Sequence, residues 1–233
     1  MQRKTFVRCL GAALGMAAFA PVLTGCGGGA EATTDDTLDT TTTDTGNETV
    51  DGTVTPAGLS QAEIDGLLYM VEEEKLAHDV YLTLDGLWGA QVNVFGQIAP
   101  SETQHTQSVR ERILAHGLTD PTLNQALGAF VNPQLQALYD ALILQGSQDL
   151  IAALKVGCLI EEVDIQDLRD RQAEVIDEPD IVAVYDSLMC GSRNHLRAFN
   201  RTLENKGGSY TSTVLGQTAF DAIAGSANES CGR

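Results

Sequence analysis

Residues 64–85, IDGLLYMVEEEKLAHDVYLTLD, contain the pattern that decides the fold. Within them, the inward-facing positions advance by alternate steps of three and four, which traces one stripe along an α-helix. The stripe consists of Ile64, Leu67, Val71, Glu74, His78, Tyr81 and Asp85. Ser60 is the expected N-cap, with Glu63 as its capping-box partner, and the helix is expected to end near Gly86. Most of the stripe is apolar, but Glu74 places a carboxylate near its middle.

The rest of the folded region repeats this helical periodicity, and no long strand pattern stands out. The second helix is expected over about 95–116, with its regular part beginning near Ile98, because Pro100 fits only in a first turn or at a kink. Further helices are expected at about 134–144, 147–172, 179–204 and 217–224, with a loop over 117–133. We therefore predict an all-α fold, a four-helix bundle with an extra short helix in the crossover and a short C-terminal helix.

Polar residues interrupt every apolar stripe near the middle of its helix. Antiparallel packing would bring these residues to one level inside the bundle, where a carboxylate is costly unless it is paired or bound to a cation. Arg and Lys are missing from the stripes, so a metal site explains the pattern better than a salt-bridge cluster. The predicted ligands are Glu74, Glu102, His105, Glu161 and His195. His78, Asp164 and Ser192 are further candidates, as ligands or as partners of ligands. The donor types suit iron, in one or two ions, with manganese or zinc as alternatives.

Each candidate has a structural alternative. Glu74 could be one of three consecutive solvated glutamates, although the stripe points the third one inward. Glu161 is chosen over Glu162, because Glu162 shares a polar face with Lys155, Gln166 and Arg169. His105 and His195 could be hydrogen-bonded core histidines, and the carboxylates on neighbouring stripes favour ligation. Tyr81 and Tyr185 are expected in the core, with a redox role or a contact to the ligands as the alternative, and His116 on the surface at a helix end. Gly191, inside the last long helix, is expected to permit close helix packing.

Four motifs also carry a resemblance: EEEKLAHDVY (72–81), SETQH (101–105), IEEVDIQDL (160–168) and SRNHLRAF (192–199). Together they are similar to a bacterial ferritin-like family known as domain of unknown function 2202, related to rubrerythrin-type bundles. The similarity covers about residues 59–205. It implies a ferritin-like fold and a metal centre, without a known reaction. One position departs from a full di-iron set, which has glutamate where this chain has Ser192. Asp164 or His78 is the candidate to compensate; otherwise the site holds one metal, or two asymmetrically.

The first 25 residues read as a lipoprotein signal peptide. Arg3, Lys4 and Arg8 precede a short apolar stretch, and residues 23–26, LTGC, resemble a bacterial lipobox. The resemblance implies cleavage before Cys26 and lipidation of its thiol. The alternative is an ordinary secretory signal with a chance cysteine. We expect an exported protein, lipid-anchored to the bacterial cell envelope, and Gly27 favours the outer membrane over the inner one.

We divide the remaining chain into an acidic, Thr-rich disordered tether with the lipidated cysteine (26–57), the helical domain (58–206) and a C-terminal extension (207–233). With 14 Lys+Arg against 32 Asp+Glu, the net charge of −18 excludes nucleic acid as a partner. No apolar run of the mature chain suggests a membrane-spanning helix, so membrane contact is expected through the lipid alone. Cys190 and Cys231 could form a disulfide, which the sequence does not decide, and Cys158 reads as a small buried hydrophobe.

The expected function is that of a lipid-anchored ferritin-like metal-binding protein, acting as a di-iron oxidase, a peroxidase or a ferroxidase. No rubredoxin-like cysteine site is present, so an external electron donor is expected. The alternatives are a non-catalytic metal-binding or sensing envelope lipoprotein and a structural bundle. A homodimer is left open.

Overall fold

A computed structural model describes residues 58–175 and 177–231, and this part of the chain is all-helical, without a strand. The helices are α2 (Gln61–Trp88), α3 (Val94–Ala115), α4 (Pro133–Gly146), α5 (Leu150–Gln172), α6 (Pro179–Asn205) and α7 (Gln217–Ala224). The predicted all-α class is thus confirmed. The predicted signal peptide, Cys26 and the tether lie outside the described residues. Among the described helices, none combines the length and apolar character that crossing a membrane requires.

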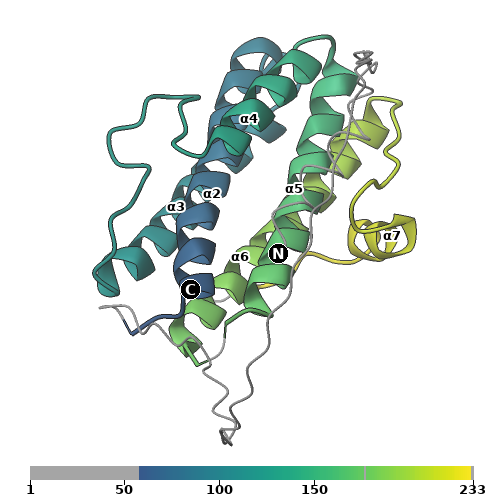
Figure 1. The fold of residues 1–233 in the computed structure, drawn as a ribbon. Helices are drawn as coiled ribbons and strands as arrows, with labels where there is room; N and C mark the ends of the chain where they lie inside the picture. Colours follow the sequence, from purple (N-terminus) through teal and green to yellow (C-terminus); the bar gives the residue numbers. More distant parts are fainter. Residues whose placement is uncertain (1–57, 176, 232–233) are drawn as a thin grey trace, which may run out of the picture.

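The four long helices pack side by side, and α4 lies across one face of the group (Figure 1). Helix α2 packs on α3 and α5, and α6 packs on α5 and α3. The loop after α3 returns the chain along the outside to α4, so that α3 and α5 run in the same direction (Figure 1). The crossover expected between the second and third long helices is therefore present, with the short helix inside it.

Side-chain caps set where several helices begin. The Ser60 hydroxyl accepts from the Glu63 amide at 3.3 Å, and the Glu63 carboxylate accepts from the Ser60 amide at 2.7 Å, which confirms the predicted capping box. Asn132 accepts from the Gln134 amide at the start of α4. Asp149 accepts from the Ala152 amide at 2.8 Å, so α5 begins at Leu150, three residues later than predicted.

Helix α3 starts at Val94, one residue before the predicted start, and it is helical through Pro100, whereas its regular part was expected to begin only near Ile98. The reason lies in α2, because Asp85 accepts a hydrogen bond from the Gly96 amide at 3.0 Å and so anchors the first turn. Proline then removes only its own donor from an otherwise supported helix.

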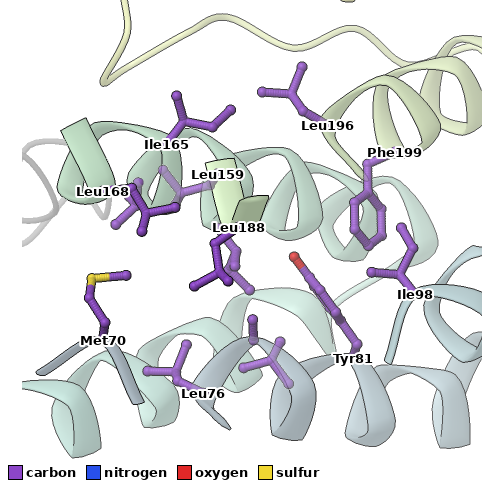
Figure 2. Close-up of a cluster of buried hydrophobic side chains, with 14 of the residues drawn as sticks. Met70, Leu76, Tyr81, Ile98, Leu159, Ile165, Leu168, Leu188, Leu196 and Phe199 are labelled. Carbon is purple, nitrogen blue, oxygen red and sulfur yellow. The ribbon is translucent and has the colours of Figure 1, made fainter. Parts of the chain in front are cut away.

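The apolar core fills the space between the long helices. Figure 2 shows Met70, Leu76, Tyr81, Leu188 and Phe199 among the side chains that meet there. The rings of Tyr81 and Phe199 lie 4.9 Å apart between centroids, and Phe95 adds a third ring 5.4 Å from Phe199. Gly157 makes room for this group, because a Cβ there would lie 2.4 Å from the Phe199 ring.

The burial of Glu162, the neighbour of Glu161 on α5, departs from the prediction. Glu162 is fully buried, with 0% exposure, although its face of α5 was expected to be polar and solvated. It accepts hydrogen bonds from the Tyr210 hydroxyl at 2.8 Å, from the Ser212 hydroxyl, and from the Thr213 amide at 3.2 Å. The prediction was wrong because the C-terminal segment covers this face, which helical periodicity alone does not reveal.

Glu72 and Glu73 are buried as well, so Glu74 is not distinguished from its two neighbours by burial. Neither Glu73 oxygen has a hydrogen-bond partner, and burial raises the pKa of its carboxyl. The Glu72 carboxylate accepts from the amides of Val131 at 2.6 Å and Asn132, in the loop that precedes α4. The crossover therefore covers a second face of α2.

The C-terminal segment is fastened to α6 by a disulfide and by ion pairs. Cys190 is bonded to Cys231, which settles the pairing that the sequence left open, and Cys158 is free and buried as expected. Arg197 is buried, donates to the Ile223 carbonyl at 3.0 Å and pairs with Glu229. Residues after α6 are thus an integral part of the folded structure.

Glu162→Ala should lower the free energy of unfolding by about 2–4 kcal/mol, because several partly buried donors lose their acceptor together. Urea denaturation followed by circular dichroism measures this. As a control, Glu204→Ala on exposed α6 surface should change stability by less than about 0.5 kcal/mol. Equal effects of the two substitutions would contradict the role assigned to Glu162.

Cys231→Ser should destabilise the protein by up to about 4 kcal/mol, since the disulfide closes a loop with a sequence separation of 41 residues. The loss should appear first as faster hydrogen exchange in α7 and the residues after it, measured by mass spectrometry. Uniform exchange changes across all helices would argue against a local clamp.

Candidate metal centre

The predicted ligands come from all four long helices and meet around Glu102. Its Oε2 lies 2.9 Å from His105 Nδ1, and its Oε1 lies 2.7 Å from His195 Nδ1. Each of these three residues offers a ligand atom within 4.8 Å of the other two. The two imidazole rings stack, with centroids 5.3 Å apart. Glu102 from α3 thus stands between one histidine of its own helix and one of α6.

Glu74 and Glu161 complete the group from α2 and α5. Glu74 Oε2 lies 3.2 Å from His105 Nδ1, and Glu161 Oε2 lies 3.6 Å from His195 Nδ1. Each histidine therefore has one glutamate of its own and shares Glu102 with the other. This arrangement contains two similar half-sites, joined through a central carboxylate.

Burial and missing partners make the group suitable for a cation. Glu74 and Glu102 are 1% and 2% exposed. Glu74 Oε1 is buried without a hydrogen-bond partner. Glu102 Oε1 and His195 Nδ1 are also buried, and they contact each other as an ion pair at 2.7 Å, without the geometry of a hydrogen bond. Buried polar atoms are nearly always partnered. In the described part of the chain, the ion pairs of these glutamates are with histidine alone. A bound metal ion would satisfy the atoms that no side chain satisfies.

The pKa values of these groups follow from burial and from their mutual charges. Burial raises the pKa of Glu74 to about 7, although His105 opposes the shift. Burial acts in the same sense on Glu102, but His195 and His105 outweigh it and hold the pKa of that carboxyl below its usual range. For His195, burial lowers the pKa, but Glu102 and Glu161 prevail and raise it to about 10. Without a metal the imidazoles are therefore protonated counterions, and a metal ion would displace their protons.

Asp164 and Ser192, two of the further candidates, lie beside this group. Asp164 is buried, and one of its oxygens accepts from the Ser192 hydroxyl, while Oδ1 has no partner. Burial, and then the charges of Glu74 and Glu161, raise the pKa of Asp164. The third candidate, His78, is directed elsewhere. Its Nδ1 lies 2.8 Å from Asp79 Oδ1, and its side chain is 28% exposed.

Three residues outside the predicted ligand set support the ligands. The Tyr81 hydroxyl donates to Glu161 Oε1 at 2.5 Å, and Ser101 Oγ lies 3.0 Å from His195 Nε2. Gly191 makes room for His105, because a Cβ at position 191 would lie 2.5 Å from Nε2 of that ring. For Tyr81 the contact with a ligand was the alternative to core packing, and for Gly191 close packing was expected. Ser101 was missed, because no sequence signal distinguished it.

A second group of ligand-type residues lies where α3 ends and α6 begins. It consists of His116, Glu178 and Asp180. His116 Nε2 lies 3.2 Å from Asp180 Oδ2, and the guanidinium of Arg112 lies 3.3 Å from the same oxygen. All three residues are half-buried. Arg112 already supplies a positive charge, so the central group has the stronger case for a metal.

The chain resembles proteins that have themselves no assigned function. Residues 63–227 match the model of a family described as an uncharacterized protein domain, DUF2202. Over 171 residues the chain is 42% identical to the uncharacterized protein MJ0754 of Methanocaldococcus jannaschii, covering 73% of this chain and 91% of that protein. A crystal structure of hypothetical protein MJ0754 from Methanococcus jannaschii superposes with a TM-score of 0.70 at 42% identity, covering 73% of this chain and 96% of that one. The family match includes α7 and so extends beyond residue 205, where the motif similarity stopped. The chain therefore belongs to the uncharacterized DUF2202 family.

Proposed function

We propose that this protein binds a dinuclear metal centre, preferably of iron, in a ferritin-like bundle, and that the centre carries out redox chemistry with oxygen or peroxide. The observation that carries the proposal is the buried cluster of three glutamates and two histidines from four helices, in which the glutamates form ion pairs with histidine alone among the described residues and Glu74 Oε1 has no hydrogen-bond partner. Three carboxylates and two imidazoles from four helices are a donor set for iron, manganese or zinc.

The ferritin-like assignment is supported by the order of the ligands along the chain. In such bundles, two helices each give one Glu, and the other two each give Glu-x-x-His. Here α2 and α5 give Glu74 and Glu161, and α3 gives Glu102 with His105. Helix α6 gives His195, preceded by Ser192 in place of Glu. The parallel course of α3 and α5 also suits a bundle with one long crossover (Figure 1).

Iron bound here would supply one-electron chemistry towards oxygen or peroxide. The protein would hold the ion on buried ligands, exclude bulk water and fix the ligands in place. Tyr81 holds Glu161 through its hydroxyl, and Ser101 holds the far nitrogen of His195. Within the described residues, two cysteines form a disulfide and the third, Cys158, is buried alone, so no cysteine cluster is left to hold an electron-transfer iron site. Electrons would therefore come from an external donor.

The site of action that we propose is the bacterial cell envelope, with the protein anchored through a lipid on Cys26. This part of the proposal rests on the signal-like sequence of residues 1–26.

Ser192 favours one alternative, a non-catalytic metal-binding lipoprotein. Replacing a glutamate of the full set by serine removes a carboxylate that would balance the charge of an oxidised iron pair. Such a protein would bind zinc or manganese without turning over oxygen.

Glu102→Ala should weaken metal binding at least roughly 100-fold, or about 2.7 kcal/mol, because Glu102 contacts both histidines. The full chain, purified without a histidine tag and loaded with Fe(II) without oxygen, should carry about two irons before the substitution. Elemental analysis and a binding titration measure this, with circular dichroism to check folding. Glu111→Ala, an exposed position on the same helix, is the matched control and should leave the iron content unchanged. Unchanged binding in Glu102→Ala would remove the basis of the proposal.

Exposure of the Fe(II)-loaded protein to oxygen or peroxide should oxidise the iron faster than free Fe(II) at the same pH. Glu102→Ala should reduce the rate to that of free Fe(II). Stopped-flow absorbance follows the reaction. Tight binding without accelerated oxidation would favour the non-catalytic alternative.

A further inference from the structure

We infer that Asp164 supplies the fourth carboxylate of the proposed metal centre, which Ser192 does not provide. Ser192 holds this aspartate in place through a hydrogen bond from its hydroxyl. The inference rests on the proposed metal centre and specifies how it is completed. In this inference the fourth carboxylate comes from α5, at Asp164, rather than from α6, at position 192.

Asp164 and Glu74 each have one buried carboxylate oxygen without a hydrogen-bond partner, in the region where we propose that metal binds. Asp164 is 6% exposed, and its Oδ1 has no hydrogen-bond partner, as is also true of Glu74 Oε1. Burial raises the pKa of Asp164, and the nearby charges of Glu74, Glu161 and Glu102 raise it further. Asp164 therefore lies near the glutamates of both half-sites.

The position of Ser192 explains why α5 contributes the ligand. Ser192 precedes His195 by three residues, where the Glu-x-x-His pattern would place the second bridging glutamate. Its side chain is too short to bridge, and its hydroxyl donates to Asp164 Oδ2. Asp164 follows Glu161 by three residues, so both project from one face of α5.

A purely structural role for Asp164 fits the contacts poorly. Two buried carboxylates outside the centre are well supplied with donors: Glu162 accepts from the segment after α6, and Glu72 from the loop before α4. A third, Glu73, has no hydrogen-bond partner on either oxygen, and burial raises the pKa of its carboxyl. Asp164 receives one hydroxyl, from Ser192 at the position that lacks a glutamate, and in the described part of the chain it forms no ion pair with Lys or Arg. A buried carboxylate with a free oxygen is unfavourable unless it takes up a proton or binds a cation.

Metal stoichiometry in matched variants tests the inference. The full chain is titrated with Co(II) without oxygen, monitored by visible absorption and elemental analysis. The wild type should bind about two ions. Asp164→Asn should keep one and bind the second at least about tenfold more weakly, equivalent to about 1.4 kcal/mol. Asp170→Asn, an exposed position on the same helix, removes the same charge and should bind like the wild type.

Returning the carboxylate to α6 provides the decisive variant. Asp164→Ser combined with Ser192→Glu exchanges the two side-chain types and should restore binding of the second ion. Without metal, Asp164→Asn should unfold at the same or a higher urea concentration than the wild type, because it removes a poorly supported carboxylate. A structural aspartate would instead be destabilised by this change, and the exchange would not recover metal binding.

The outcomes separate this inference from the proposed function. A wild type that binds no Co(II) or Fe(II) overturns both. A wild type that binds two ions, with Asp164→Asn unchanged, overturns the role of Asp164 and leaves the proposed function standing. Loss of the second ion in Asp164→Asn and its recovery in the exchanged variant support the inference. If Asp164→Asn does not fold, the exchanged variant alone decides, because binding of only one ion would then contradict the inference.

Discussion

The concentration of buried negative charge at the middle of the bundle is the constraint on which the rest of the structure depends. Glu74, Glu102, Glu161 and Asp164 share a region that also contains His105 and His195 and is largely closed to solvent. Without a metal, protons on the imidazoles and on the raised-pKa carboxyls balance part of this charge. Such a group persists only if the surrounding helices hold it together, and the aromatic cluster of Tyr81, Phe95 and Phe199 provides that support.

The sequence allowed the helices and the ligand candidates to be predicted because both follow from local periodicity. A helix presents the same face every three or four residues, so a glutamate or histidine on an apolar stripe usually points inward, although His78 on the α2 stripe does not. That reasoning selected Glu74, Glu102, His105, Glu161 and His195, and the structure brings these five side chains together. The capping box at Ser60 was predictable for the same reason, because it involves only residues three positions apart in the chain.

Faces covered by distant segments could not be predicted in this way. Glu162 was expected to be solvated, because nothing within its helix signals that residues near Tyr210 fold back over it. Glu72 is covered by the loop before α4 for the same reason. Pro100 led to the expectation that the regular part of α3 begins near Ile98. The hydrogen bond that supports the first turn comes from Asp85 on another helix, so the local sequence does not reveal it. The direction of His78 was equally undetermined, because its neighbour Asp79 takes its hydrogen bond.

Two adjacent glutamates in α5 are held from opposite sides. Glu161 receives the Tyr81 hydroxyl from within the bundle, while Glu162 receives the segment after α6 from outside. Successive residues of a helix are separated by about 100° around its axis. Rotation of α5 in either direction would therefore strain one of the two anchors. The two anchors therefore fix the rotation of α5 about its axis. An adjustment of the centre to a bound metal ion would come from side-chain torsions rather than from turning or sliding of the helix that carries Glu161 and Asp164.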